Sequence, residues 1–478
     1  MHPFRLADAE LAGLGAGRPS AGALGVLRRA RLSRHLLLLR EVRRAVAEDP
    51  AWYVRLHALS SDEFRAHCAD PMTGLWAARA LAALRTGPPA EPGRAALGDL
   101  PEPAGHPLSV TCAGRRLTVR LDDRGPLRHL LGLPAAAPLR PDEVARWREH
   151  LDAAWTILVT RHPEAAGTLA GVLRVIVPAR PDPLAEGVSA TSAEAFGAVA
   201  LSAPASGVQL AVALLHETQH SVLNAVHGLF ELVHPGTEPG YSPWREDPRP
   251  TFGILHGGYA FLAVTRFWRT ELRGGCGGEA EFEFARWRAA VHRMAGRLLG
   301  GGRLTAAGAR LVTALRDEVE PWLAEPVDPE VVRLADLARA DHHARWRLRN
   351  LTIAPDDVAA VARAWRAGRA APAVASVVAP GRRVTDAGSR LRLIRAVLRG
   401  DPPAAGSADA ACVRGDGAAA LTAYREAVRR DRADGAAWSG LALVAPQPAL
   451  RHRPELVRAA ALAAPEADIA DLAAWLSR

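Results

Sequence analysis

A pentapeptide with two histidines four residues apart constrains this chain more than any other feature. Residues 216 to 220 are His-Glu-Thr-Gln-His, and apolar residues flank them at 210–215 and 222–223. Side chains four residues apart lie on one face of an α-helix, so both imidazoles can reach one metal ion, and Glu217 lies close enough to contact its ligands. A helix that carries these polar groups by chance is the alternative, but buried polar groups need partners. The pattern therefore predicts a metal-binding helix.

A third metal ligand is expected downstream, because a catalytic ion normally takes three protein ligands and keeps open positions for substrate. His227 lies about two turns further along the same helix and is too distant to share the ion. His256 begins a second predicted helix after a loop that contains glycine, and it is the preferred candidate. Glu246, Glu271 and Glu238 are the alternatives. A hydrogen-bonded histidine at a helix start is the structural alternative for His256.

The segment between the two predicted helices, residues 241–250, is Tyr-Ser-Pro-Trp-Arg-Glu-Asp-Pro-Arg-Pro. Its three prolines stiffen it and hold Arg245 and Arg249 in place, together with Tyr241 and Trp244. A rigid arginine suits a carboxylate, because its planar fork donates two parallel hydrogen bonds. An enzyme with a dicarboxylic 2-oxoacid as co-substrate needs such a group, whereas a hydrolase of internal peptide bonds does not. An ion pair with the loop's own acidic residues is the alternative.

The flanking sequence predicts a mainly α fold with a small β component. Helical spacing covers residues 8–85 and resumes at Pro141, which is placed where a helix start tolerates proline. The predicted strands are a hairpin over 108–112 and 117–121, and two further strands near 174–178 and 196–202. A strand directly before a metal-binding helix is typical of zincin-like domains, in which an extended peptide can pair with the sheet edge.

The chain is predicted to divide into three regions. Residues 1–140 form a mostly helical region with a small hairpin, and residues 141–330 form the catalytic core with the HExxH helix. Residues 331–478 are rich in alanine and arginine and contain a helix pair, near 418–442, that resembles a tetratricopeptide unit. A single unit does not make a solenoid, so this region either binds a partner or serves packing alone.

Composition narrows the possible partners and the compartment. The net charge of +9 comes from arginines spread along the whole chain, which contains no lysine, so a nucleic-acid partner is not expected. Arginines interrupt the leucine-rich stretch 27–46, which predicts a basic amphipathic helix and no membrane span. The four cysteines lie far apart without a C-x-x-C pair, and the N-terminus lacks a signal-peptide pattern. A cytoplasmic location is therefore expected.

The motifs together are similar to those of a known family. The HExxH string, the segments Tyr241-Ser-Pro-Trp-Arg245 and Asp247-Pro-Arg-Pro250, and His256-Gly-Gly-Tyr-Ala-Phe261 resemble the bacterial HExxH-type peptide-modification proteins. Those proteins occur with ribosomally synthesised, post-translationally modified peptides. Members are described as 2-oxoglutarate- and iron(II)-dependent peptide β-hydroxylases. The resemblance is strongest over about residues 170 to 270.

The resemblance implies a ligand set and a substrate. His216, His220 and His256 would hold iron(II), and Arg245, or else Arg249, would bind the distal carboxylate of 2-oxoglutarate. Most oxygenases of this cofactor class use two histidines and one carboxylate, so a third histidine would change the net charge at iron. The implied substrate is a ribosomal precursor peptide, which the C-terminal region could hold. The chain lacks the cysteine cluster of radical-SAM enzymes and would act as a stand-alone protein.

Glu217 has a different role in each of two hypotheses. In a hydroxylase it would orient a ligand or the substrate. In a zinc metallopeptidase that cleaves a precursor or leader peptide, it would be the general base for a zinc-bound water. The motif alone favours the peptidase, whereas the arginine loop and the family resemblance favour the hydroxylase.

Overall fold

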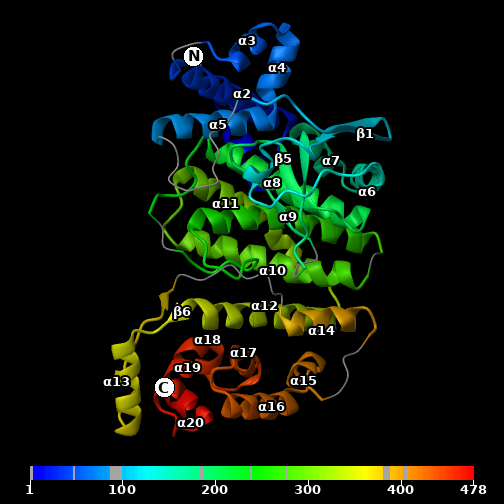
Figure 1. Cartoon of the computed structure of the whole chain (residues 1–478). Coiled ribbons are helices and arrows are strands. Elements are labelled where there is room, and N and C mark those ends of the chain that lie inside the picture. Colours follow the sequence, from blue (N-terminus) through cyan, green and yellow to red (C-terminus); the bar gives the residue numbers. More distant parts are fainter. Residues whose placement is uncertain are drawn as a thin grey trace. The chain divides into compact units, whose positions relative to one another are not determined.

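The computed structural model of the chain describes residues 4–46, 49–86, 99–183, 187–236, 239–275, 277–379, 388–401 and 406–478. They form two compact units. Unit 1 comprises Met1–His234, Gly258–Thr270 and Leu299–Glu320, and unit 2 comprises Pro235–Gly257, Glu271–Leu298 and Pro321–Arg478. Both are mainly helical, and unit 1 holds a small sheet (Figure 1), which confirms the predicted mainly α class. The predicted region boundaries after residues 140 and 330 stay predictions.

Unit 1 contains a five-stranded sheet and the helices around it. Its helices are α1 (Asp8–Gly15), α2 (Ala21–Arg44), α3 (Ala51–His57), α4 (Ser61–Ala69), α5 (Pro71–Thr86), η1 (Arg128–Leu131), α6 (Pro141–Arg161), α7 (Pro163–Val172), α8 (Gly207–His227) and α11 (Ala306–Val319). Its strands are β1 (His106–Cys112), β2 (Arg115–Leu121), β3 (Val175–Ala179), β4 (Ser189–Ala190) and β5 (Ala198–Ser202). Helix α9 (Thr251–Arg273) contributes its middle part to this unit.

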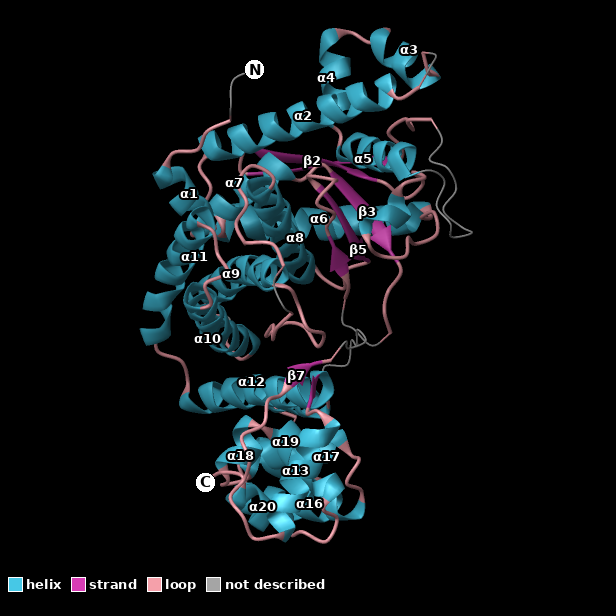
Figure 2. Cartoon of the chain, turned by 90° about the vertical axis from the view of Figure 1, so that its left-hand side faces the viewer, coloured by secondary structure: helices cyan, strands magenta, loops and turns pink. Residues whose placement is uncertain are grey.

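The sheet lies between two layers of helices (Figure 2). Its strand order is β1-β2-β3-β5-β4, with β2, β3 and β5 parallel and the outer strands antiparallel to their neighbours. Successive side chains of a strand face opposite sides. Ile176, Val199 and Leu201 accordingly pack with α6 and α8, whereas Val175 and Val177 pack with α2 to α5. Burial on both faces explains why β3 and β5 are continuous apolar runs.

The predicted hairpin is confirmed as β1 and β2, which pair antiparallel with Cys112 opposite Arg115. Ala113 and Gly114 form the two-residue turn, and both have positive φ, at 45° and 74°. A two-residue turn with this backbone matches the twist of the strands it joins. Gly114 adopts the conformation freely, while Ala113 is the chain's non-glycine residue with positive φ among those described.

Unit 2 is almost entirely helical. Its helices are α10 (Glu279–Gly300), η2 (Glu320–Ala324), α12 (Pro329–Asn350), α13 (Pro355–Arg366), α14 (Ser389–Leu398), α15 (Ala408–Arg414), α16 (Gly417–Arg430), α17 (Gly435–Val444), α18 (Pro448–His452), α19 (Pro454–Ala463) and α20 (Ile469–Trp475). The strands β6 (Leu351–Thr352) and β7 (Val377–Val378) pair antiparallel. Parts of α10 and η2 at the unit boundaries belong to unit 1.

Helices α16 and α17 are the pair that the sequence predicted at 418–442. They pack closely because Gly440 faces the ring of Tyr424: a Cβ at this glycine would lie 2.2 Å from Cε1 of the tyrosine. Trp438 is fully buried in the same cluster. In the described part of the chain, no helix combines the length and apolar character that crossing a bilayer requires.

Candidate metal centre

The two histidines lie in the middle of α8, as the sequence predicted. Ser206 caps the helix by accepting a hydrogen bond of 3.2 Å from the Gln209 amide. Leu210 and Leu214 anchor one side of the helix in the core cluster shared with α6 and the sheet. His216 and His220 lie on another side and are partly buried. Apolar packing thus fixes the helix, and the helix fixes the spacing of the imidazoles.

The two imidazoles face each other at close range. Their Nε2 atoms are 3.0 Å apart, and their ring planes lie at 88°. The ring of Phe261, from α9, packs edge-on against His216 at 5.2 Å between ring centroids. Burial lowers the pKa of His216, although the charge of Glu217 acts in the opposite direction. His216 is therefore neutral at pH 7, which is the form that binds a metal ion.

The separation of the two nitrogens fits one shared ion. With metal–nitrogen bonds of about 2.1 Å, atoms 3.0 Å apart subtend about 90° at the ion. That is the angle between neighbouring positions of an octahedron, whereas a tetrahedral ion with such bonds would need nitrogens about 3.4 Å apart. Among the described residues, His216, Glu217 and His220 form a group whose potential ligand atoms all lie within 4.8 Å of one another. The donor set suits a first-row transition metal.

Glu217 is held by two hydroxyl groups. Its side chain is buried, with 2% exposure. Ser189 donates a hydrogen bond of 2.6 Å to Oε1, and the Thr191 hydroxyl donates to Oε2. Oε1 lies 3.9 Å from Nε2 of His216. Both carboxylate oxygens therefore accept fixed hydrogen bonds, and one of them also faces the histidine pair.

Ser189 and Thr191 were not among the predicted site residues. Ser189 belongs to β4, and Thr191 follows that strand directly. Residues two apart in an extended segment point to the same side, so both hydroxyls can reach one carboxylate. A strand of two residues is too short to give a periodic signal, but two hydroxyl residues before a buried strand were a detectable feature of the sequence.

In the loop 241–250, both predicted carboxylate-binding arginines contact Asp247. Arg245 donates from Nε at 2.7 Å and from Nη2 at 3.1 Å, so one edge of its guanidinium binds Asp247 through two hydrogen bonds. Arg249 makes a single contact of 3.4 Å through Nη1. Burial alone would raise the pKa of Asp247, but the hydrogen bond and charge of Arg245 hold it below its usual value. The ion pair that the sequence left as an alternative is therefore present, and it engages Arg245 more than Arg249.

Tyr241 and Trp244, the other two predicted co-substrate residues, are packed within unit 2. The Tyr241 hydroxyl lies 2.9 Å from Nδ1 of His342, and burial raises the pKa of this phenol well above its usual value. Trp244 lies against the start of α9, because a Cβ at Gly257 would lie 1.7 Å from the indole nitrogen. Both aromatic residues thus position the loop.

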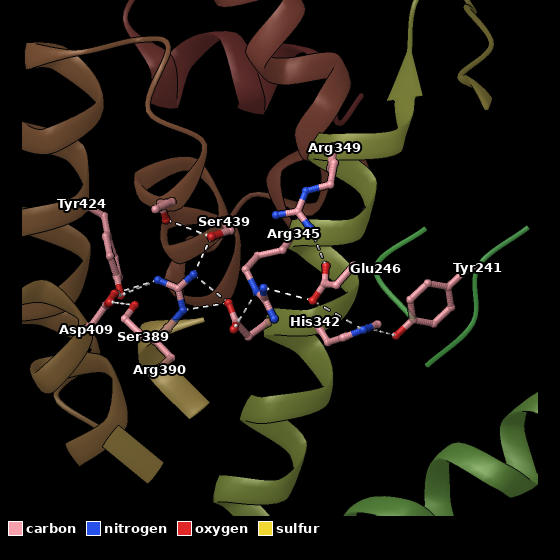
Figure 3. A network of polar contacts seen from close by, with 12 residues as sticks. Tyr241, Glu246, His342, Arg345, Arg349, Ser389, Arg390, Asp409, Tyr424 and Ser439 are labelled. Atoms are coloured by element: carbon pink, nitrogen blue, oxygen red, sulfur yellow. Dashed lines mark hydrogen bonds and ion pairs between the residues drawn. The ribbon is translucent and has the colours of Figure 1, made fainter. Parts of the chain in front are cut away.

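His256 lies in the second turn of α9, on the same helix as Phe261, and its ring centroid is 5.5 Å from that of Phe252. Its role as third ligand stays a prediction. Among the alternatives, Glu246 forms ion pairs with Arg345 at 3.1 Å and Arg349 at 2.9 Å (Figure 3). Its carboxylate is thus neutralised within unit 2. Glu271 is buried in α9 with 3% exposure, and Glu238 lies outside the described residues.

A second buried polar cluster lies deeper in unit 2, around Arg390 (Figure 3). The guanidinium is 2.7 Å from Oδ1 of Asp341 and 2.7 Å from Oδ1 of Asp409, and it also donates to the hydroxyls of Ser439 and Tyr424. Burial opposes its charge, but the two carboxylates overcome that effect and raise the pKa of Arg390. The cluster joins α12, α14, α15, α16 and α17.

No protein-family model matches the sequence, and no curated protein matches it. The function is therefore inferred from the histidine pair, the carboxylate of Glu217 beside it and the arginines of the loop.

Proposed function

We propose that this chain is an iron(II)- and 2-oxoglutarate-dependent hydroxylase that acts on the β-carbon of a residue in a ribosomally synthesised peptide. Iron(II) with 2-oxoglutarate and dioxygen would supply the oxidation, in which one oxygen atom enters the peptide C–H bond and the other enters succinate as carbon dioxide is released. His216 and His220 would hold the metal, with His256 as the third ligand. We also propose that the core around α8 is zincin-like.

The observation that carries the proposal is the fixed environment of Glu217. In a zinc peptidase this glutamate takes a proton from the metal-bound water, so its carboxylate must be free to face that water. Here both oxygens accept hydrogen bonds, from Ser189 and Thr191. A carboxylate anchored in this way suits the orientation of a neighbouring ligand better than proton transfer. The 3.0 Å separation of the histidine nitrogens also favours a six-coordinate ion.

Arg249 is the better candidate for the distal carboxylate of 2-oxoglutarate. Arg245 already donates two hydrogen bonds to Asp247, whereas Arg249 donates one long one and is 36% exposed in its side chain. A guanidinium has five N–H donors, so Arg249 can bind a second carboxylate without leaving Asp247. In this proposal Arg245 positions Asp247, and Asp247 positions Arg249.

The outer strand of the sheet supports a peptide as the substrate. β4 is the last strand in the sheet order of the described residues, and Ser189 of this strand contacts Glu217 on α8. An extended peptide that paired with β4 would therefore pass close to the histidine pair. This support is shared by the alternative function, a zinc metallopeptidase with Glu217 as general base.

A single variant separates the two functions. Purified protein is loaded anaerobically with iron(II), exposed to air with 2-oxoglutarate and candidate precursor peptides, and assayed for succinate and for peptide mass. The hydroxylase is expected to form succinate and to add one oxygen atom, and Glu217→Gln is expected to retain about a hundredth to a tenth of that activity, as for a residue that orients a ligand.

The zinc-loaded protein serves as the matched control. Peptide fragments formed with zinc alone, and lost by about 100-fold or more in Glu217→Gln, would establish the peptidase and reject the hydroxylase, because general-base catalysis contributes about that factor.

A further inference from the structure

A large pocket lies within unit 1, on a side of α8 away from the histidine pair. Its volume is about 850 Å³, within the range of small-molecule sites. The segment 17–24, the start of β2, the end of α6, the start of α7, and parts of α8 and α9 line it. Leu215 and Gln219 are the residues that α8 contributes, each next in sequence to one of the two histidines. None of the predicted site residues lines this pocket.

Positive charge dominates the lining. The basic side chains of the lining are five arginines and a histidine: Arg18, Arg115, Arg116, Arg161, Arg266 and His162. Glu164 is the one carboxylate among the described lining residues. Glu318, which is not among them, forms ion pairs with Arg18 and Arg266. Arg115, Arg116 and Arg161 are exposed, so their positive charge attracts anions from solvent to this pocket.

The start of α7 adds to the positive potential. This helix has ten residues and begins at Pro163, and its N-cap residue His162 makes no side-chain capping bond. The first N–H groups of a helix have no acceptor within the helix, and the helix dipole places positive charge at this end. Residues 163–167 all line the pocket. The helix start therefore offers backbone donors to the same anion that the arginines attract.

Gln219 supplies an independent indication of a ligand. Its side chain is 3% exposed, and its Oε1 has no hydrogen-bond partner among the described residues. A buried acceptor without a donor is unfavourable, so a bound molecule with an N–H or O–H group would satisfy it. Apolar surface lies beside it, because Leu215, Trp155 and Phe267 also line the pocket.

We propose that this pocket binds an organic carboxylate that carries an N–H group beside the carboxylate and an apolar body. The arginines and the start of α7 bind the carboxylate, Gln219 accepts the N–H, and the aromatic wall packs on the apolar body. An N-acyl amino acid and the C-terminal residue of a peptide both have this chemistry. The site is separate from the proposed metal centre and does not require it.

The test is calorimetric titration of the full-length protein with matched probes. N-acetyl-phenylalanine has all three features, its amide lacks the charge, 3-phenylpropionate lacks the N–H, and inorganic phosphate has charge alone. We expect N-acetyl-phenylalanine to bind at least about tenfold more tightly than its amide, and several-fold more tightly than 3-phenylpropionate. Equal binding of acid and amide, or phosphate binding as tightly as N-acetyl-phenylalanine, would overturn the proposal.

Two variants and a control locate the site. Arg116→Gln and Gln219→Met are each expected to weaken binding of N-acetyl-phenylalanine by about fivefold or more, because each removes one hydrogen-bonding group. Arg28→Gln, which removes an exposed arginine of α2 outside the pocket, is expected to leave it unchanged. Unchanged binding in both pocket variants would contradict the assignment of the binding site to this pocket. The probe series on the unaltered chain tests the proposal even if a variant fails to fold. A pentapeptide that ends in phenylalanine identifies a peptide terminus if it binds more tightly than N-acetyl-phenylalanine, and a free metabolite if it binds more weakly.

Discussion

The polar clusters of the two units differ in what their side chains already bind. In unit 2, Arg390 contacts two carboxylates and two hydroxyls, so opposite charges and hydrogen-bond donors are matched within the protein. On α8 of unit 1, two groups of the same kind face each other, with imidazole nitrogens 3.0 Å apart. The first cluster is complete without a ligand. The second has a nitrogen–nitrogen separation that suits a shared cation.

The comparison shows that burial alone does not mark a functional site. Glu217 and Asp341 are equally buried, at 2% exposure. The hydrogen bonds of Asp341 run to arginines, as in a structural ion pair, whereas those of Glu217 run to two neutral hydroxyls beside a pair of metal-type ligands. The nature of the partners distinguishes a cluster that stabilises the fold from one whose groups suit a metal ion.

The largest expected effect is on stability and tests the structural cluster. Arg390→Met removes the cation that Asp341 and Asp409 share and leaves the buried Asp341 with Arg345 alone. The expected loss is up to about 3–5 kcal/mol, the cost of removing one partner of a buried pair. Urea unfolding followed by circular dichroism measures it. Arg366→Ala, which breaks an exposed pair with Glu466, is the control and is expected to leave the free energy of unfolding nearly unchanged. If the two variants lost equal free energy of unfolding, the Arg390 cluster would stabilise unit 2 no more than an exposed ion pair does.

The next effect concerns pH and a buried histidine of unit 1 that serves packing. His35 is 2% exposed, its Nδ1–H donates to the Cys68 carbonyl, and burial lowers its pKa to about 4. The unfolded chain binds this proton near pH 6.5, so the contribution to stability is present above that pH and is lost as the pH falls towards 4. The loss is at most about 3 kcal/mol.

Urea midpoints measured between pH 7 and pH 4 check this prediction. The variant His35→Asn keeps a donor near the Cys68 carbonyl but cannot take up a proton. It is expected to be less stable at pH 7 and to show a weaker dependence on pH in this window. An unchanged dependence would assign the acid sensitivity to other groups, such as His343 of unit 2, whose pKa burial also lowers to about 4.

Removal of one imidazole from α8 tests whether the histidine pair binds the metal. His216→Ala is expected to weaken iron(II) binding by at least about 100-fold, because loss of outer-shell partners alone costs 10–100-fold. Unfolding in metal-free buffer is expected to change little, since His216 is partly exposed. Metal content after dialysis measures the binding, and His129→Ala, an exposed histidine of η1, is the control. Equal metal content in both variants would place the metal elsewhere.

The smallest expected effect separates the two loop arginines. Arg249→Ala is expected to raise the KM for 2-oxoglutarate about tenfold, because a charge-assisted hydrogen bond contributes about 1.5–3 kcal/mol. Arg245→Ala is expected to raise this KM less and, in addition, to lower the melting temperature, because Asp247 loses its bidentate partner. Steady-state kinetics with succinate detection provides the values. A larger KM increase in Arg245→Ala without loss of stability would reverse the two roles.

Much of the fold followed from local patterns in the sequence. Apolar spacing predicted α6 and α8, alternation predicted the β1–β2 hairpin, and short apolar runs predicted β3 and β5. The histidines of the HExxH helix share one side of α8 because the spacing of four is a local property. These features need no knowledge of distant contacts.

Other features depended on contacts distant in sequence. Ser189 and Thr191 reach Glu217 over 28 and 26 residues, and Glu246 reaches Arg349 over 103. No periodicity encodes such pairs, because they depend on how the strands and helices pack. The same is true of the pocket beside Gln219, whose lining comes from segments between residues 17 and 270. The preference for Arg249 over Arg245 likewise required the observed contacts of Asp247.

The central claim, that His216 and His220 hold an iron that binds 2-oxoglutarate, is tested most directly by anaerobic absorption spectroscopy. Iron(II) is added to the metal-free protein, followed by 2-oxoglutarate. The claim predicts a visible charge-transfer band that forms in proportion to iron, disappears in His220→Ala, and persists in Glu217→Gln. Stoichiometric iron binding without such a band, or a band of the same strength in His220→Ala, would contradict it.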